Sequence, residues 1–166
     1  TEKLVEAAAR HHGIVYLRTT RNDTPLIYQE HETFPIGGSK VLCSSAHDVA
    51  TVVAAGITLH EALAAYEELK KQKILIRVID LYSIKPLDMK TLKKAARETK
   101  VIITVEDHYA EGGLGEAVAG ALAQEKTPIH IMAVRKMTRS GKSAELLDYE
   151  EISRSAIVKM VKKLRP

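Results

Sequence analysis

The chain has 166 residues, about one domain by length, and its 45% hydrophobic and 28% charged residues exclude general disorder. The net charge of +4 is spread along the sequence with few aromatic residues, a pattern that does not favour nucleic-acid binding. No apolar run approaches the roughly 18 residues of a membrane span, and the single cysteine, Cys43, excludes an internal disulfide. We expect a cytoplasmic chain without nucleic-acid or membrane partners. Because it begins at Thr1 rather than Met, we expect it to be cut from a longer protein.

The first forty residues read as a helix, a strand and a linker. Helical spacing of apolar residues predicts a helix over residues 2–12, which Gly13 ends. Residues 14–17 predict a short buried strand. Residues 18–39 are polar and rich in Pro and Gly, so we expect a linker with at most one short strand over residues 26–28. A domain boundary is expected near residues 34–39.

After the linker, strands and helices alternate. The predicted strands are residues 40–44, 49–55, 74–80, 101–105 and 129–134, and the predicted helices are residues 58–72, 89–99, 115–123 and 148–164. Three caps are expected, from a Thr58–Glu61 capping box, from Asp88 and from an Asp148–Glu151 capping box. Alternation at this spacing favours an α/β sheet with right-handed crossovers. The short gap between the first two strands suggests a hairpin and one antiparallel edge strand.

Two glycine-containing motifs are partial matches to phosphate-binding loops. Residues 140–143 resemble the end of a P-loop, but position 136 is Lys rather than the required Gly, so we expect a solvated basic loop. Gly113-x-Gly115 follows a strand and opens a helix, as in a dinucleotide fingerprint, but the third position is Val118. The two glycines equally suit a tight turn with close helix packing. A looser anion site at this helix N-terminus stays open, although Glu116 opposes it.

Polar residues that could perform chemistry are scattered. Glu106-Asp107-His108-Tyr109 ends a predicted strand and could support acid–base catalysis, or it could form a polar loop without a dyad. Arg18 and Arg21 follow the first predicted strand and could grip a phosphate, or could be surface arginines. No metal site is expected, because zinc-like spacing is absent among His11, His12, His31, His47, His60, His108 and His130.

Six stretches together resemble one enzyme family. In order and spacing they are similar to the C-terminal third of transketolases, closest to the animal and archaeal types, across essentially the whole chain. Looser versions occur in deoxyxylulose-phosphate synthases and in β subunits of 2-oxoacid dehydrogenases. The stretches are Arg18-Thr19-Thr20-Arg21, Ile27-Tyr28 and residues 57–65, 84–88, 104–118 and 139–147.

The resemblance implies both an architecture and an activity. The implied fold is a three-layer α/β structure with a mixed sheet of about five strands, four parallel and one antiparallel at the edge. Residues 1–36 would be the tail of a middle, pyrimidine-binding domain with a linker, and residues 37–166 the C-terminal domain. The parent would be a homodimer that transfers a two-carbon ketol unit between sugar phosphates in the pentose phosphate pathway. It would use thiamine diphosphate and Mg²⁺ or Ca²⁺, bound by domains absent here, so this chain alone is expected to bind no cofactor and to be inactive.

One functional residue carries over by resemblance. Arg21 matches the family arginine that binds the phosphate of the sugar. Asn22 stands where vertebrate members tend to have Pro, so the loop is expected to differ slightly, and Arg18 is assigned a structural role. No catalytic, cofactor-binding or metal-binding residue is assigned. The alternative is a stand-alone α/β module that binds an anionic nucleotide or a protein partner, and a variant of the first reading is a split enzyme with this chain in a separate subunit.

Overall fold

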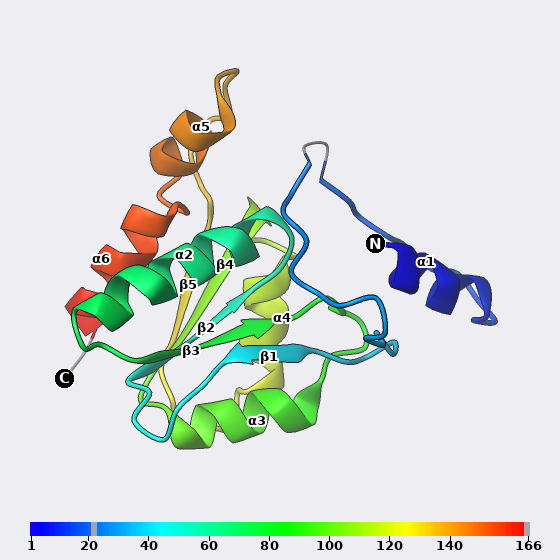
Figure 1. Ribbon diagram of the computed structural model, residues 1–166, viewed down its shortest axis with the longest axis horizontal. Coiled ribbons are helices and arrows are strands. Elements are labelled where there is room, and N and C mark those ends of the chain that lie inside the picture. Colours follow the sequence, from blue (N-terminus) through cyan, green and yellow to red (C-terminus); the bar gives the residue numbers. More distant parts are fainter. Residues whose placement is uncertain (21–22, 165–166) are drawn as a thin grey trace.

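A five-stranded mixed sheet lies at the centre of the computed structural model, which describes residues 1–20 and 23–164. The strand order is β1-β3-β2-β4-β5 (Figure 1). β1 pairs with β3 in the antiparallel direction and all other pairs are parallel, which confirms the predicted antiparallel edge strand. The strands are β1 (Lys40–Cys43), β2 (Ala50–Ala54), β3 (Ile76–Asp80), β4 (Ile102–Tyr109) and β5 (Ile129–Val134).

Helices cover both faces of the sheet, so the predicted three-layer α/β architecture is confirmed (Figure 1). α2 (Ile57–Lys71) and α6 (Arg154–Leu164) pack on one face. α3 (Met89–Glu98) and α4 (Leu114–Ala121) pack on the other. Because β2 and β3 are buried at every position, each apolar strand residue contributes to one of the two cores. Two further helices, α1 (Glu2–Ala9) and α5 (Ser143–Tyr149), lie outside this three-layer arrangement.

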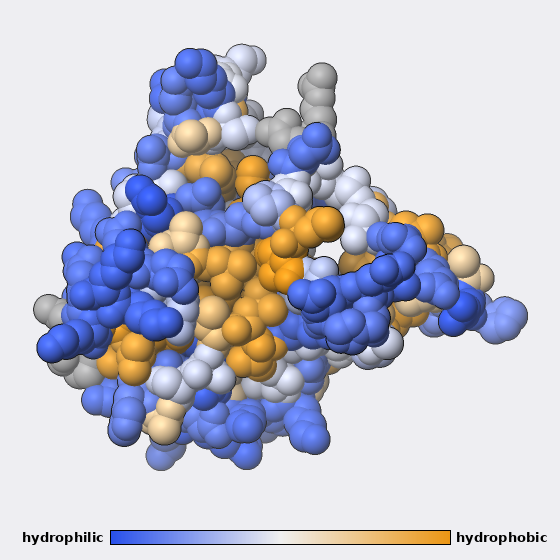
Figure 2. Space-filling model, viewed as in Figure 1, coloured by the Kyte–Doolittle hydropathy of each residue, from blue (hydrophilic) through white to orange (hydrophobic). Residues whose placement is uncertain are grey.

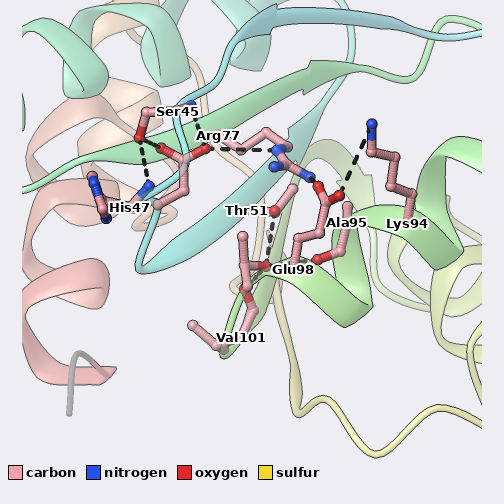
Figure 3. A network of polar contacts seen from close by, with 10 residues as sticks. Ser45, His47, Thr51, Arg77, Lys94, Ala95, Glu98 and Val101 are labelled. Carbon is pink, nitrogen blue, oxygen red and sulfur yellow. Dashed lines mark hydrogen bonds and ion pairs between the residues drawn. The ribbon is translucent and has the colours of Figure 1, made fainter.

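The first two strands do not form the expected hairpin, because β1 pairs with β3 instead of β2. β2 is apolar on both faces and takes a position between β3 and β4, where both faces are covered. The connection between β1 and β2 is held by a polar network (Figure 3). The Asp48 carboxylate accepts hydrogen bonds from the Ser45 backbone N–H and hydroxyl. The guanidinium of buried Arg77, in β3, lies 3.6 Å from the Asp48 carboxylate and 2.7 Å from the Glu98 carboxylate of α3.

The observed helix N-termini confirm one of the three predicted caps and contradict the other two. The Asp88 carboxylate accepts from the Thr91 backbone N–H at 3.0 Å, as expected for the N-cap of α3. α2, however, begins after Gly56, and the Thr58 hydroxyl donates to the carbonyls of Ala55 and Val105 instead of capping. The Thr58–Glu61 capping box is therefore wrong.

The last predicted helix is two helices. α5 ends at Tyr149, the chain turns at Glu151 with a φ of 58°, and α6 begins only at Arg154. The Ser153 hydroxyl accepts from the Ala156 backbone N–H at 3.4 Å at the start of α6. Asp148 lies inside α5, so it caps no helix together with Glu151. The sequence expectation failed because the turn between the two helices contains neither Gly nor Pro.

The predicted strands over residues 14–17 and 26–28 are absent from the described part of the chain. α1 ends at Ala9 rather than at residue 12. Side chains of residues 14–17 are exposed and no neighbouring strand pairs with them. A strand needs such a partner to form, so apolar composition alone did not suffice. The N-terminal arm, residues 1–17, lies at the right of the view in Figure 2 and shows apolar surface.

Residues of the linker nevertheless dock on the sheet. Tyr28 and Phe34 meet edge to face at 4.8 Å between ring centroids, and Phe34 meets Tyr82 at 5.0 Å. The Lys40 ammonium of β1 lies 4.9 Å from the Phe34 ring and 2.9 Å from the Glu32 carboxylate. These contacts hold the linker against β1 and β3. The boundary between residues 36 and 37 stays a prediction.

Candidate functional site at the carboxyl edge of the sheet

The connections between strands move across the sheet in opposite directions on the two sides of one place. β2 leads through α2 to β3 on one side, whereas β4 leads through α4 to β5 on the other. The carboxyl ends of β2 and β4 are neighbours, so the two connections diverge there. In open α/β sheets this divergence leaves the crevice in which ligands bind. The carboxyl edge between β2 and β4 is therefore the candidate functional site.

A cleft of about 360 Å³ lies at this edge. Its walls come from the start of the linker, the ends of β4 and β5, the start of α2, α5 and the loop before α5. It mixes both charge signs with apolar side chains. The lining residues are Arg18, Thr19, Thr20, Ile57, Asp107, Val134, Thr138, Arg139, Ser143, Leu146, Leu147, Glu150 and Ile152.

The N-terminal wall is fixed to the sheet by Arg18. Its Nη2 atom donates a hydrogen bond to the Asp107 carbonyl at 2.8 Å, and it lies 3.7 Å from the Asp107 carboxylate. A Cβ atom on Gly56, just before α2, would lie 3.6 Å from the Thr20 methyl group. Residues 18–20 therefore lie across the carboxyl ends of both β4 and β2, which gives Arg18 the structural contact expected of it.

The opposite wall is basic and exposed. The Arg139 guanidinium stacks 3.6 Å from the centre of the Tyr149 ring, and the Lys136 ammonium lies 4.9 Å from the same ring. The Glu150 carboxylate accepts from the backbone N–H groups of Arg135 and Lys136. Residues 135–145 are all exposed, in agreement with the solvated basic loop predicted for residues 140–143, although Ser143 already belongs to α5.

The N-terminus of α4 is already occupied by a carboxylate. Glu106 is buried, and it accepts hydrogen bonds from the backbone N–H groups of Leu114 at 2.6 Å and Gly115 at 2.8 Å. Burial raises the pKa of Glu106, and these two hydrogen bonds oppose the rise. The N–H groups that a phosphate would need are thus bound by the protein itself, which disfavours an anion or a cofactor diphosphate at this helix.

Close packing explains both glycines of the Gly113-x-Gly115 motif. A Cβ atom on Gly113 would lie 2.1 Å from a Glu106 carboxylate oxygen, and one on Gly115 would lie 2.5 Å from Ile131. Neither position tolerates a side chain unless the helix moves. The close-packing interpretation of this motif is confirmed.

Glu106, Asp107 and His108 point to different partners. Glu106 binds the start of α4, Asp107 lies beside Arg18, and the His108 Nδ1 atom lies 2.7 Å from the Tyr109 carbonyl. These contacts form no acid–base dyad. The predicted loop is wrong, because residues 106–109 are the last four residues of β4. Within residues 1–20 and 23–164, no group of three or more His, Cys, Asp or Glu side chains could hold a metal ion. In the same ranges no helix is long and apolar enough to cross a membrane.

The predicted substrate-binding residue, Arg21, lies outside the described residues, so its role stays a prediction. Two features of the site were missed by sequence reasoning. α5 could have been found from Leu146 and Leu147 behind an acidic first turn. The Tyr28 hydroxyl donates to the Asp80 carboxylate, a contact across 52 positions that leaves no local signal.

Known proteins share this sequence and fold. Residues 39–157 match the family described as "Transketolase, C-terminal domain". Mouse (Mus musculus) transketolase is 52% identical over 99% of this chain, which spans 27% of that protein. Bovine (Bos taurus) transketolase-like protein 1 is 49% identical over 99% of this chain and 28% of its own length. The chain thus spans about a quarter of the curated relatives that it matches.

Solved structures agree with this assignment. A protein described as "Split gene transketolase, inactive beta4 tetramer" superposes with a TM-score of 0.91 at 33% identity, over 97% of this chain and 53% of that one. A Campylobacter jejuni transketolase shares the fold alone, with a TM-score of 0.58 at 19% identity over 76% of this chain and 18% of that one. The matched family, the relatives and the five-stranded mixed sheet together show that this chain belongs to the transketolase family and carries its C-terminal domain.

Proposed function

We propose that this chain serves as the C-terminal part of a thiamine-diphosphate-dependent transketolase of the pentose phosphate pathway. The observation that carries the proposal is 52% identity to a transketolase over 99% of the chain. The parent is a cytoplasmic homodimer that moves a two-carbon ketol unit between sugar phosphates. Thiamine diphosphate and Mg²⁺ or Ca²⁺ bind to its other domains. Residues 1–36 complete the middle domain, and residues 37–166 support assembly of the dimer.

In this proposal Arg21 binds the phosphate of the sugar. A guanidinium offers two parallel N–H donors to a phosphate, and binding this remote group orients the reacting carbonyl. Arg21→Ala in the longer protein is expected to raise KM for a phosphorylated donor by roughly 30-fold or more, equivalent to about 2 kcal/mol. The KM for an unphosphorylated donor should change little. An equal rise for both donors would remove Arg21 from the phosphate site.

The 166-residue chain alone is expected to catalyse no ketol transfer. The N-terminus of α4 is filled by Glu106, which leaves no free helix terminus there for the cofactor diphosphate. The measurement is a coupled ketol-transfer assay on the pure chain with thiamine diphosphate and Mg²⁺. Turnover above that of a heat-denatured sample would contradict this part of the proposal.

A separate small subunit is the second candidate, favoured by the described "split gene" origin of the structure that superposes at a TM-score of 0.91. An immunoblot of source extract with an antibody against this chain distinguishes the two arrangements. A band more than three times the size of this chain means a single-chain enzyme. A band nearer to that of the chain itself means a separate subunit or module, and binding partners would then be sought by co-purification.

A further inference from the structure

The loop between β5 and α5, residues 135–142, is exposed along its whole length. β5 ends at Val134 and α5 begins at Ser143, so the loop belongs to no helix or strand. In Figure 1 it is the orange segment that projects beyond α5, away from the sheet. Another protein can therefore bind this loop without disturbing either core.

The loop combines positive charge with a free hydroxyl. Its four cations are Arg135, Lys136, Arg139 and Lys142. The Thr138 hydroxyl lies among them, and within residues 1–20 and 23–164 it takes part in no hydrogen bond. An exposed hydroxyl with this charge pattern suits a protein kinase whose substrate groove is lined by carboxylates.

The spacing of the cations selects Thr138 among the hydroxyls of the loop. Arg135 precedes Thr138 by three positions, and Lys136 precedes it by two. An extended chain rises about 3.3 Å per residue, so Arg135 would reach an acidic subsite about 10 Å from the reacting hydroxyl. Ser140 has the uncharged Met137 three positions before it, so the pattern favours Thr138 over Ser140.

The contacts that hold the loop are ones that a kinase can displace. The Glu150 carboxylate accepts from the backbone N–H groups of Arg135 and Lys136 at 3.2 and 3.1 Å. The Tyr149 hydroxyl donates to the Met137 carbonyl at 3.4 Å. All three hydrogen bonds are exposed, so water can replace them at a small cost in free energy. The loop can therefore extend into a kinase groove while β5 and α5 stay folded.

We propose that Thr138 is a phosphorylation site for a serine/threonine protein kinase that selects arginine before the hydroxyl. The Thr138 Oγ1 atom bonds to the γ-phosphorus of a nucleoside triphosphate as the bond to the bridging oxygen breaks. The hydroxyl proton passes to the kinase, and a nucleoside diphosphate leaves. This inference goes beyond the proposed function and does not depend on it.

Phosphorylation would change the charge of the cleft wall, because Thr138 and Arg139 both line the cleft. The phosphate adds a charge of about −1.5 to −2 at pH 7. It lies next in sequence to Arg139, whose guanidinium stacks 3.6 Å from the centre of the Tyr149 ring. A phosphate oxygen is a stronger partner for a guanidinium than a ring face, so the phosphate competes with Tyr149 for Arg139.

The test incubates the longer protein that contains this chain with a purified kinase of this specificity, ATP and Mg²⁺. Mass spectrometry of the digested protein locates the phosphate, and initial rates give kcat/KM for the site. We expect phosphate at Thr138. Thr138→Ala should abolish phosphorylation of the loop, Thr138→Ser should retain it, and Ser140→Ala should leave the rate at Thr138 within about twofold.

Arg135→Met tests the charge pattern, and Lys142→Met is the matched control, because each removes one exposed cation from the same loop. We expect Arg135→Met to lower kcat/KM for Thr138 about tenfold or more, and Lys142→Met to leave it within about twofold. Equal effects of the two variants would overturn the inference, because the kinase would then respond to net charge alone. Phosphate found at Ser140 and not at Thr138 would overturn it as well.

A synthetic peptide of residues 132–144 separates recognition of the sequence from its presentation by the fold. The folded protein should react with a kcat/KM within about tenfold of that of the peptide, because the loop is already exposed. A peptide that is phosphorylated while the folded protein is not would show that the loop is inaccessible, and would overturn the inference. An unreactive peptide would reject the charge pattern itself.

Discussion

Two short apolar stretches of similar composition have opposite fates in this molecule. Residues 14–17 are Ile-Val-Tyr-Leu and residues 102–105 are Ile-Ile-Thr-Val, and both have high strand propensity. The first stretch is exposed and forms no strand, whereas the second is buried in β4 between β2 and β5. Strand propensity therefore becomes strand structure only where neighbouring strands supply hydrogen-bond partners and helices cover the faces.

The same contrast extends to the helices of the two regions. α1 buries none of its residues, although its apolar positions are arranged along one face. α2 buries five residues against the sheet and α6. An amphipathic helix with no partner surface gains little from tertiary packing. This difference supports the proposal that residues 1–36 belong with an upstream domain.

Truncating one isoleucine in each stretch should give the largest difference in free energy of unfolding between the two regions. Ile102→Ala removes a fully buried side chain from the core beneath α3 and α4, so we expect about 3–4 kcal/mol less free energy of unfolding. Ile14→Ala removes a fully exposed side chain and should change it by less than about 0.5 kcal/mol. Urea unfolding of the 166-residue chain measures both. A loss above about 1 kcal/mol at Ile14 would mean that the arm packs within this chain.

The pH dependence of stability tests how firmly the linker is docked on the sheet. Burial raises the pKa of Asp80 to about 6, and the Tyr28 hydrogen bond opposes this rise. A raised carboxyl pKa means that the folded chain binds the Asp80 proton more tightly than the unfolded chain does. The protonated Asp80 therefore stabilises the fold fully below pH 3.8, and this stabilisation is lost between pH 3.8 and 6. Stability should therefore fall across this window, by at most about 3 kcal/mol from this group.

Asp80→Asn isolates that contribution, because the amide carbonyl still accepts from Tyr28 but does not titrate. The quantity to compare is the change in free energy of unfolding between pH 4 and pH 6.5 in the original chain and in the variant, since all other titrating groups are shared. Between pH 4 and pH 6.5, the original chain should lose more free energy of unfolding than the variant does. Identical pH profiles would show that Asp80 is solvated and that the linker is not docked over it.

Two glycines of α4 allow a packed position and an open position to be compared within one helix. Gly115→Ala would place a methyl group 2.5 Å from Ile131, and we expect a loss of about 2 kcal/mol. Gly120→Ala meets nothing within 4 Å and should add roughly 0.5 kcal/mol of stability through helix propensity. Thermal unfolding of both variants compares them directly. If the two substitutions had the same sign, α4 would not be pressed against the sheet at Gly115.

Much of the sheet domain could be predicted from the sequence, because its signals are local. The run of apolar residues in β2 indicates a strand covered on both faces, and Asp88 before a helical repeat indicates a cap. The long block of residues 104–118, which contains Gly113-Leu114-Gly115, pointed to the family. The failures have a different origin. Pairing of β1 with β3 depends on contacts between distant segments, and the capping role assigned to Thr58 was displaced by its hydrogen bond to Val105.

The sequence by itself determined the strand and helix alternation and the family, because apolar periodicity and short motifs express local preferences. Only the tertiary structure decided that Glu106 fills the N-terminus of α4, that Arg18 contacts β4 and that Tyr28 contacts β3. Those contacts join residues whose separation in sequence is 8, 89 and 52 positions. The sheet brings them together by placing the carboxyl ends of its parallel strands along one edge, and no local preference encodes that arrangement.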